Sequence, residues 1–172
     1  MMVGLVAIFV SRGQSAVPEI AGVGQDPVDK RRARIVEIMQ RTLKAGEGRI
    51  VRNGQIINTY TRRGPSTEDV EEIRAYGDDA VPILADYLSS NKAPEYELAM
   101  KFLGAIGGSS IVPPLQVVIL QDQSARKREY AVITITQAPR DEAIAVLRSA
   151  AANDHDARVR EVAKEMLKVM RP

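Results

Sequence analysis

Three tetrapeptides decide the fold of this chain: Tyr96-Glu97-Leu98-Ala99, Arg128-Glu129-Tyr130-Ala131 and Arg160-Glu161-Val162-Ala163. They share a Glu-x-Ala core, and their alanines are 32 residues apart both times. Leu103, Ile135 and Leu167 keep that spacing, and Leu84, Leu115 and Leu147 keep it to within one residue. A repeat of this length is typical of a stacked solenoid, in which each unit buries its apolar face against the next one.

Each unit is predicted to be two helices joined by a short turn. Apolar residues recur at helical spacing on both sides of the turn, and Pro82 and Pro113 stand where the first turn of a helix tolerates a missing N–H. The predicted pairs are 67–76 with 80–89, 93–106 with 110–121, and 124–137 with 141–152, followed by a last helix at 156–170. A small residue at the Ala position lets neighbouring helices approach closely.

Two stretches resemble the HEAT-like repeats of bacterial α-solenoids. They are Leu103-Gly104-Ala105-Ile106-Gly107 with Ile111-Val112-Pro113-Pro114-Leu115, and Asp156-Ala157-Arg158-Val159-Arg160-Glu161-Val162-Ala163. The resemblance covers about 66–170 and implies an all-α superhelix of helix pairs. The third unit departs from the pattern because Thr134-Ile135-Thr136-Gln137-Ala138 lacks the usual glycine. The family's Asp–Arg ladder is also incomplete, since position 96 is Tyr where 128 and 160 are Arg.

Residues 1–65 lie outside the resemblance, so the chain divides into 1–26, 27–65 and a repeat domain at 66–172. Asp26-Pro27 begins an amphipathic helix at about 27–45. Asn53-Gly54 between β-formers predicts a small hairpin with strands near 49–52 and 55–61. Because two strands alone are marginally stable in water, we expect the hairpin to pack on the first helices.

The apolar run at 1–10 is too short to span a bilayer as a helix. It has the length of a signal-peptide core, and Gly13-Gln14-Ser15 offers small residues for cleavage, but no Lys or Arg precedes it. A core strand or a docked terminal segment explains the run equally well. Export and a cytoplasmic location both stay open.

The residue types leave little for catalysis. The chain has no Cys and one His, His155, which removes thiolate and Cys-zinc chemistry and leaves a His-built metal or triad site almost nothing to work with. His155 lies between Asp154 and Asp156, where a turn with a helix N-cap explains it better than a metal site. Gly104, Gly107 and Gly108 resemble a phosphate loop, but no strand precedes them and no Lys follows. We therefore expect no catalytic residue, metal or cofactor.

Charge is unevenly distributed along the chain. Residues 1–65 hold 11 basic and 5 acidic side chains, and 66–121 hold 3 and 9. Basic and acidic parts could hold each other together or mark different partner surfaces. Three basic runs are possible phosphate contacts: 30–34, 62–63 and 126–128. The column Glu97, Glu129 and Glu161, with Arg128 and Arg160 beside it, is interpreted as inter-repeat ion pairs on a solvated face.

These observations favour a non-enzymatic module that binds a protein on a concave face lined by the second helices. The residues expected there are Ala85, Asp86, Gln116, Val117, Arg148 and Ser149. The stretch 117–120 is more apolar than a half-buried helix needs, which fits either core packing or a groove for a partner peptide. The alternative is nucleic-acid binding, as in HEAT-like DNA glycosylases, although this chain has no Trp. An enzymatic role, as in HEAT-like phycobilin lyases, has no supporting motif.

The last helix is expected to end the array. Val159, Val162, Ala163, Met166, Leu167 and Met170 form a stripe for the preceding repeat. Charged side chains cover the rest of the helix, as the outer side of a terminal repeat requires.

Overall fold

The computed structural model describes residues 27–45, 49–52, 55–58 and 64–170. Its helices are α1 (Pro27–Ala45), α2 (Thr67–Tyr76), α3 (Val81–Leu88), α4 (Ala93–Ile106), α5 (Val112–Gln121), α6 (Ala125–Thr134), α7 (Arg140–Asn153) and α8 (Ala157–Val169). Two short strands, β1 (Arg49–Arg52) and β2 (Gln55–Asn58), lie between α1 and α2. The predicted helix pairs of the repeat are therefore confirmed, and the body is an all-α stack.

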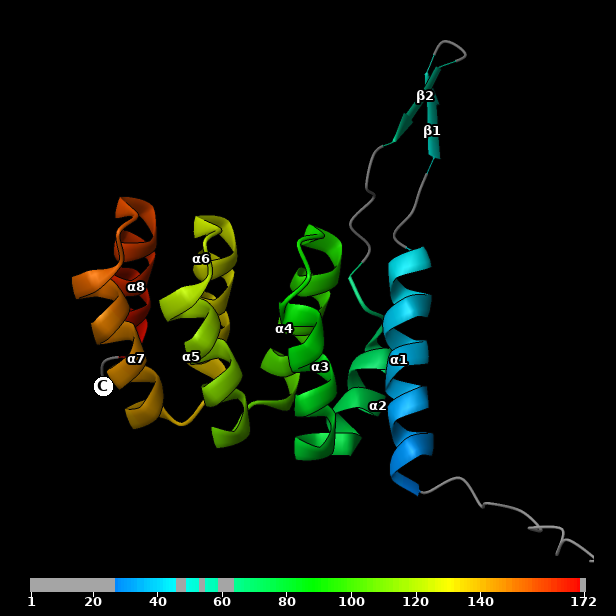
Figure 1. Ribbon diagram of the computed structural model, residues 1–172, viewed down its shortest axis with the longest axis horizontal. Helices are drawn as coiled ribbons and strands as arrows, with labels where there is room; N and C mark the ends of the chain where they lie inside the picture. Colours follow the sequence, from blue (N-terminus) through cyan, green and yellow to red (C-terminus); the bar gives the residue numbers. More distant parts are fainter. Residues whose placement is uncertain (1–26, 46–48, 53–54, 59–63, 171–172) are drawn as a thin grey trace, which may run out of the picture.

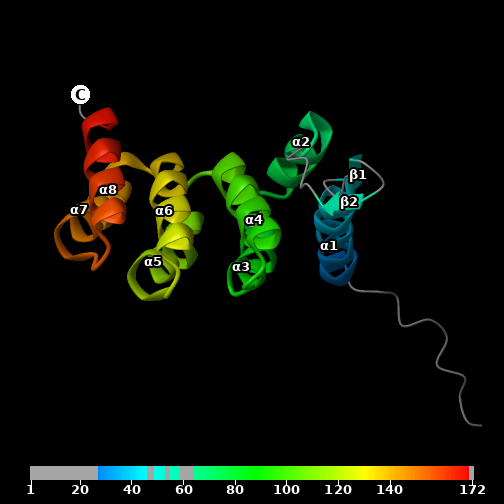
Figure 2. The ribbon, with the colours of Figure 1, turned by 90° about the horizontal axis from the view of Figure 1, so that it is seen from above.

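The helices form two layers (Figure 1). Seen from above, α2, α4, α6 and α8 form one row, and α1, α3, α5 and α7 form the other (Figure 2). We call these rows the first-helix layer and the second-helix layer. Helices α2, α4 and α6 of the first layer each lead into the second layer through a 3₁₀ turn, at 77–80, 109–111 and 135–137 respectively. The three turns lie on one edge of the stack.

Backbone chemistry explains where the helices end. Ser66 caps α2, because its side chain accepts a hydrogen bond from the N–H of Asp69. Gly77 and Gly107 follow α2 and α4 with φ of 53° and 67°, a region that favours glycine. A Cβ on Gly107 would also meet the carbonyl oxygen of Gln137 at 3.0 Å. The third unit needs no such glycine, because α6 passes directly into its 3₁₀ turn with Ile135 in the right-handed helical region.

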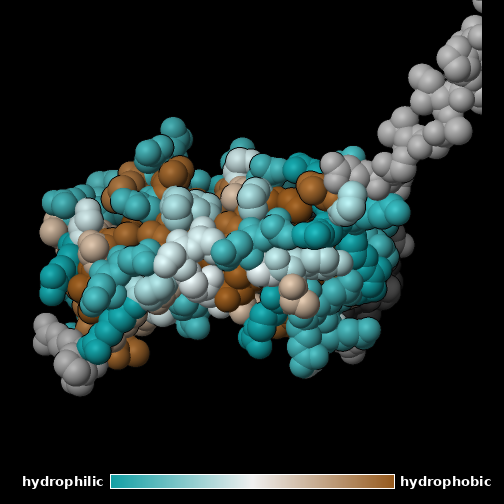
Figure 3. Space-filling view, turned by 90° about the horizontal axis from the view of Figure 1, so that it is seen from below, coloured by the Kyte–Doolittle hydropathy of each residue, from teal (hydrophilic) through white to brown (hydrophobic). Residues whose placement is uncertain are grey.

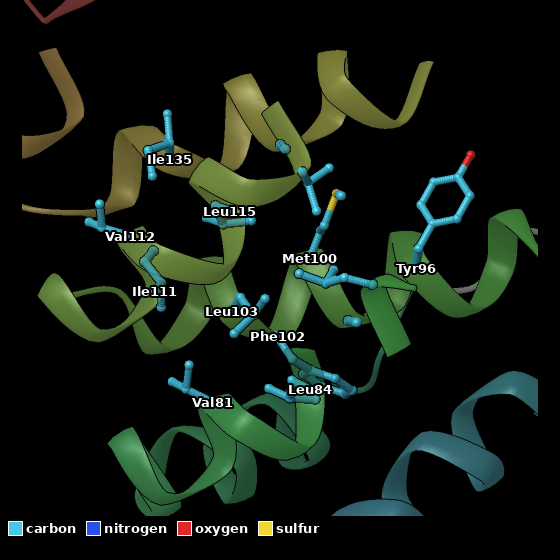
Figure 4. Close-up of a cluster of buried hydrophobic side chains, with 14 of the residues drawn as sticks. Val81, Leu84, Tyr96, Met100, Phe102, Leu103, Ile111, Val112, Leu115 and Ile135 are labelled. Atoms are coloured by element: carbon cyan, nitrogen blue, oxygen red, sulfur yellow. The ribbon is translucent and has the colours of Figure 1, made fainter. Parts of the chain in front are cut away.

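The core follows the 32-residue register. Ala99, Ala131 and Ala163 are all fully buried, and so are Leu84, Leu115 and Leu147. Figure 4 shows side chains from α3, α4 and α5 meeting in one cluster, with Leu84, Phe102 and Leu103 among them. The alanines are thus where the sequence places them, in the closely packed layer between units.

Helix α1 belongs to this same packed body. Ile35, Ile38 and Met39 have no exposed surface and are part of the cluster that contains the repeat core. Four arginines of α1 also pair with acidic residues of α2, α3 and the turn between them. The basic helix α1 is therefore attached to the acidic segment that follows it by ion pairs as well as by apolar contacts.

Strands β1 and β2 pair antiparallel, with Ile50 opposite Ile57 and Val51 opposite Ile56. Asn53, Gly54 and 59–61 lie outside the described residues, so the hairpin as a closed unit stays a prediction. Figure 1 draws the strands beyond the end of α1, away from the helix layers, which does not match the expected packing on the first helices.

Helix α8 is the last described helix, and its predicted apolar stripe is only partly buried. Of its predicted stripe, Val159 and Ala163 are buried, while Val162, Met166, Leu167 and Met170 are half-buried. Lys164 is exposed at the position where α4 has the buried Met100 and α6 has the buried Val132. Those two residues pack within the stack, whereas α8 has a charged side chain at this position, as expected for the outer side of a terminal repeat. Among the described residues, no helix is both long and apolar enough to cross a membrane.

Candidate functional site

The outer face formed by α3, α5 and α7 carries few charges. The repeat register brings twelve positions of these helices and of the α3 C-cap to this face, and none of them is buried: Pro82, Ala85, Asp86, Ser89, Pro113, Gln116, Val117, Leu120, Ala145, Arg148, Ser149 and Ala152. Only two of the twelve are charged, in a chain whose charged residues make up 27%. We call these twelve positions the second-helix face.

All six residues predicted for the partner surface lie on this face. Ala85 and Ser149 are half-buried, and the other four are exposed. They occupy matching turns of three consecutive helices, so the structure brings them together as one band. No observation tests whether they bind a partner, and the curvature of this face also stays a prediction.

Helix α5 supplies the apolar part of the second-helix face. Val117 and Leu120 are 54% and 51% exposed, whereas Val118 and Ile119 between them are 6% and 1% exposed. The apolar stretch thus divides between core packing, at Val118 and Ile119, and exposed surface, at Val117 and Leu120, and its use as a groove for a partner peptide stays a prediction. Leu120 was not among the predicted surface residues, although its register match with Ser89 and Ala152 would have placed it there.

The two charged residues of the second-helix face differ in their contacts. Asp86 accepts a hydrogen bond from Arg32 of α1 at 2.9 Å, so α1 borders this end of the face. Arg148 has no side-chain hydrogen bond or ion pair within the described residues. Of the arginines whose side chains are described, only Arg140 shares this condition, and both lie in α7.

The outer face of the first-helix layer has the opposite character. Its twelve register positions are Pro94, Glu97, Lys101, Ala105, Arg126, Glu129, Ile133, Gln137, Arg158, Glu161, Glu165 and Val169, and seven of them are charged. Arg126 donates to Glu97 at 2.8 Å, and Arg158 pairs with Glu129 at 3.0 Å. These two pairs link neighbouring repeats, as predicted, whereas Glu161, the third glutamate of the column, pairs with Lys164 of its own helix.

Arg128 corrects one part of that prediction. It is not a partner of the glutamate column, because its side chain is 1% exposed and lies inside the stack. Its Nε and Nη2 each donate to a carboxylate oxygen of Asp154 at 2.8 Å, and Nη1 donates to the carbonyl oxygen of Asp122 at 2.8 Å. Arg160 in turn donates to the carbonyl oxygen of Asp154 at 2.7 Å. Guanidinium groups therefore tie together the turns between repeats.

A lysine fills the gap that Tyr96 leaves in this ladder. Asp122 corresponds to Asp154 one repeat earlier, but the position that matches Arg128 is Tyr96. Lys127 is 3% exposed, lies 5.2 Å from the centre of the Tyr96 ring, and pairs with Asp122 at 2.8 Å. The aromatic ring and the carboxylate together stabilise the buried ammonium. Sequence reasoning missed this unit because it read 126–128 as one basic run.

Internal contacts occupy most of the possible phosphate-binding runs. Arg34 donates to both carboxylate oxygens of Glu72, at 2.6 and 2.9 Å, while Arg31 pairs with Asp79 and Arg32 with Asp86. Arg126, Lys127 and Arg128 are engaged as described above, and residues 62–63 lie outside the described part. The alternative of nucleic-acid binding therefore loses much of the positive charge on which it depended.

Several carboxylates are stabilised in their charged form. Burial raises the pKa of Asp69, but hydrogen bonds from Arg41, Ser66 and Thr42 outweigh it, and the pKa lies below its ordinary value. Burial acts the same way on Asp154, and hydrogen bonds from Arg128 and from the backbone of Asp156 again lower the pKa overall. For Glu72, the hydrogen bond from Arg34 is the largest cause of a lowered pKa.

The remaining sequence candidates have structural roles. Asp156 caps α8 by accepting from the N–H groups of Arg158 and Val159, as predicted. His155 is exposed, with Nε2 3.0 Å from Nη2 of Arg128. In the described residues, no three His, Asp or Glu side chains are arranged to hold a metal ion. Gly107 and Gly108 lie in the turn between α4 and α5, preceded by a helix rather than a strand.

Comparison with known families agrees with this architecture. A family model described as HEAT repeats matches residues 81–168, from the start of α3 into α8, which is just over half of the chain. The chain belongs to the HEAT repeat family. Searches among curated proteins and among solved structures found no match. HEAT repeats commonly mediate protein–protein interaction, and their stacked second helices are available as an extended binding surface.

Proposed function

We propose that this HEAT repeat protein is a non-enzymatic interaction module that binds a protein partner on the second-helix face. The contrast between its two faces carries the proposal. Protein surfaces that become buried in complexes are depleted of charge at their centre, whereas ion-paired surfaces usually stay in water. The second-helix face has two charged residues in its twelve positions, and the outer face of the first-helix layer has seven in its twelve.

The exposed side chains of α5 support the same choice. Val117 and Leu120 expose apolar surface next to neutral neighbours, namely Pro113 and Gln116. Apolar patches on a soluble protein often mark the place where a partner binds. Figure 3 views the stack from the edge that carries the 3₁₀ turns and shows apolar atoms reaching the surface there in several places. The second-helix face differs from that edge because its apolar residues project from one helix at regular spacing.

Site-specific crosslinking tests this proposal. A photoreactive amino acid replaces Leu120 in one variant and Lys101, on the first-helix face, in the control variant. Both full-length proteins are illuminated in an extract of the source organism. We expect one protein to be crosslinked at Leu120 and not at Lys101. Equal crosslinking from both faces would show that the second-helix face has no special role.

A further inference from the structure

We infer that the partner presents an amphipathic helix that lays apolar side chains against Val117 and Leu120 and places a carboxylate at Arg148; this inference rests on the proposed function. The three residues lie on adjacent helices of the second-helix face, α5 and α7. Val117 and Leu120 are three residues apart on α5, so they form one ridge on its outer side. A partner helix offers apolar side chains at matching spacing, which can lie against such a ridge.

The charge of Arg148 identifies the chemistry of the second contact. Nine of the eleven arginines whose side chains are described have an internal hydrogen bond or ion pair, and Arg148 is one of the two that do not. The other charged residue of the face, Asp86, already pairs with Arg32. The exposed guanidinium of Arg148 therefore attracts a carboxylate and can bind it through two parallel hydrogen bonds. A partner helix with an Asp or Glu at this place therefore complements the charge of the face.

Small neighbours make Arg148 accessible to a helix. Ala145 and Ala152 lie one turn before and one turn after it on the exposed side of α7, and Ser149 follows it on the half-buried side. No large side chain from these positions keeps a partner backbone at a distance. The partner helix can thus approach α7 closely while the apolar residues of the partner contact the larger side chains of Val117 and Leu120 on α5.

Two other charged groups set the limits of the contact. Asp141 lies two turns before Arg148 on the same side of α7, so a partner carboxylate shifted toward the start of α7 would meet repulsion. At the opposite border of the face, next to α1, Asp86 already accepts a hydrogen bond from Arg32. The attractive position for a negative charge is therefore at Arg148. The second-helix face thus offers one unpaired cation, Arg148, which is too little for nucleic acid, whose binding needs several phosphate contacts.

The experiment selects ligands for the full-length chain from a displayed library of helix-forming 16-residue peptides. The positions that share one helical face are randomised. Affinities of the enriched peptides are then measured by fluorescence anisotropy with the wild-type chain and with Val117→Asp, Leu120→Asp, Arg148→Glu and Arg140→Glu. Arg140→Glu is the matched control, because Arg140 is an unpaired arginine of the same helix that lies off the second-helix face. Circular dichroism confirms that each variant is folded.

We expect the enriched peptides to combine an apolar pair with an Asp or Glu. Arg148→Glu should weaken them about tenfold, while Arg140→Glu should leave them within about twofold. Replacing the acidic residue of the peptide by Lys should restore binding to Arg148→Glu. Enriched peptides that need Val117 and Leu120 but bind Arg148→Glu as well as wild type would overturn the inference and leave the proposed function standing.

Two further results would also overturn the inference. If no peptide is enriched, or if the enriched peptides ignore Val117→Asp and Leu120→Asp, the second-helix face is not a helix-binding surface, and the proposed function loses its support as well. If the chain alone forms dimers that Arg148→Glu abolishes, the occupant of the face is a second copy. Sedimentation velocity of the unliganded chain detects this last case.

Discussion

Arg128 and Asp154 form an ion pair inside the repeat stack, with two hydrogen bonds of 2.8 Å between side chains that are 1% and 3% exposed. Arg128 lies on α6 and Asp154 lies in the turn between α7 and α8, so their contact fixes how that turn sits on α6. The same guanidinium also binds the carbonyl oxygen of Asp122. One side chain thereby satisfies polar groups of two turns that the stack would otherwise bury without partners.

Removal of Arg128 should be strongly destabilising. Arg128→Ala leaves the buried Asp154 carboxylate without its cation, which typically costs about 3–5 kcal/mol of unfolding free energy. Urea unfolding followed by circular dichroism measures this cost. The control is Arg126→Ala, which removes the exposed neighbour that pairs with Glu97 and should change the urea midpoint little. Similar midpoints for the two variants would contradict the buried position of Arg128.

Acid should destabilise the protein through its paired carboxylates. The pKa values of Asp154, Asp69 and Glu72 lie below their ordinary values in the folded state. The folded state therefore binds these protons less readily than the unfolded chain, and stability falls as pH decreases. This contribution is fully present above the ordinary pKa values of 3.8 and 4.5 and is lost as pH falls through the lower folded values.

The measurement is the free energy of unfolding between pH 7 and pH 2. We expect little change from these groups in the upper part of that range and a decline below about pH 4. In Asp154→Asn the decline should be shallower, because one of the titrating groups is gone. A profile that rises toward low pH would show that the three carboxylates are not stabilised in their charged form.

Lys127 and Tyr96 should behave as one unit. Lys127→Val removes the cation that pairs with Asp122 and should cost about 1–3 kcal/mol. In a Tyr96→Arg background the ladder arginine is restored, so the same replacement should cost at least about 0.5 kcal/mol less. Valine is the residue that α8 carries at the matching position, Val159. A double-mutant cycle in urea gives the coupling free energy between positions 127 and 96. Purely additive changes would contradict the idea that Lys127 takes the place of the ladder arginine.

Ala131 tests the register of the repeat. It has no exposed surface between neighbouring helices, so Ala131→Leu should overpack the layer and cost about 1–3 kcal/mol. The exposed Ala145 is the control, and Ala145→Leu should leave the denaturant midpoint nearly unchanged. An unchanged midpoint in Ala131→Leu would place this residue at the surface and break the register.

Much of the fold was predictable because it depends on local signals. The 32-residue spacing of Ala99, Ala131 and Ala163 reports a close approach that each unit repeats, and prolines and glycines mark the helix ends. The same register also orders the second-helix face, since it aligns Asp86, Val117 and Ser149. These features follow from periodicity alone.

The pairing of charges was not predictable in the same way. Arg128 and Arg126 are two residues apart and chemically identical, yet one is buried and the other is exposed. The difference depends on which turn of the next repeat lies beside each side chain, and that is a property of the three-dimensional stack. The arginines of α1 likewise pair with carboxylates of α2 and α3, and these pairs depend on how the three helices pack in space.

The most direct test of the second-helix face is the affinity of the crosslinked partner for two matched variants. Leu120→Asp and Ile133→Asp each place a carboxylate at an apolar residue about half exposed, 51% and 47% respectively, on opposite layers of the stack. Isothermal titration calorimetry should show binding weakened at least about tenfold by Leu120→Asp and unchanged by Ile133→Asp. Equal affinities for the two variants, or a loss confined to Ile133→Asp, would contradict the assignment of the binding surface to the second helices.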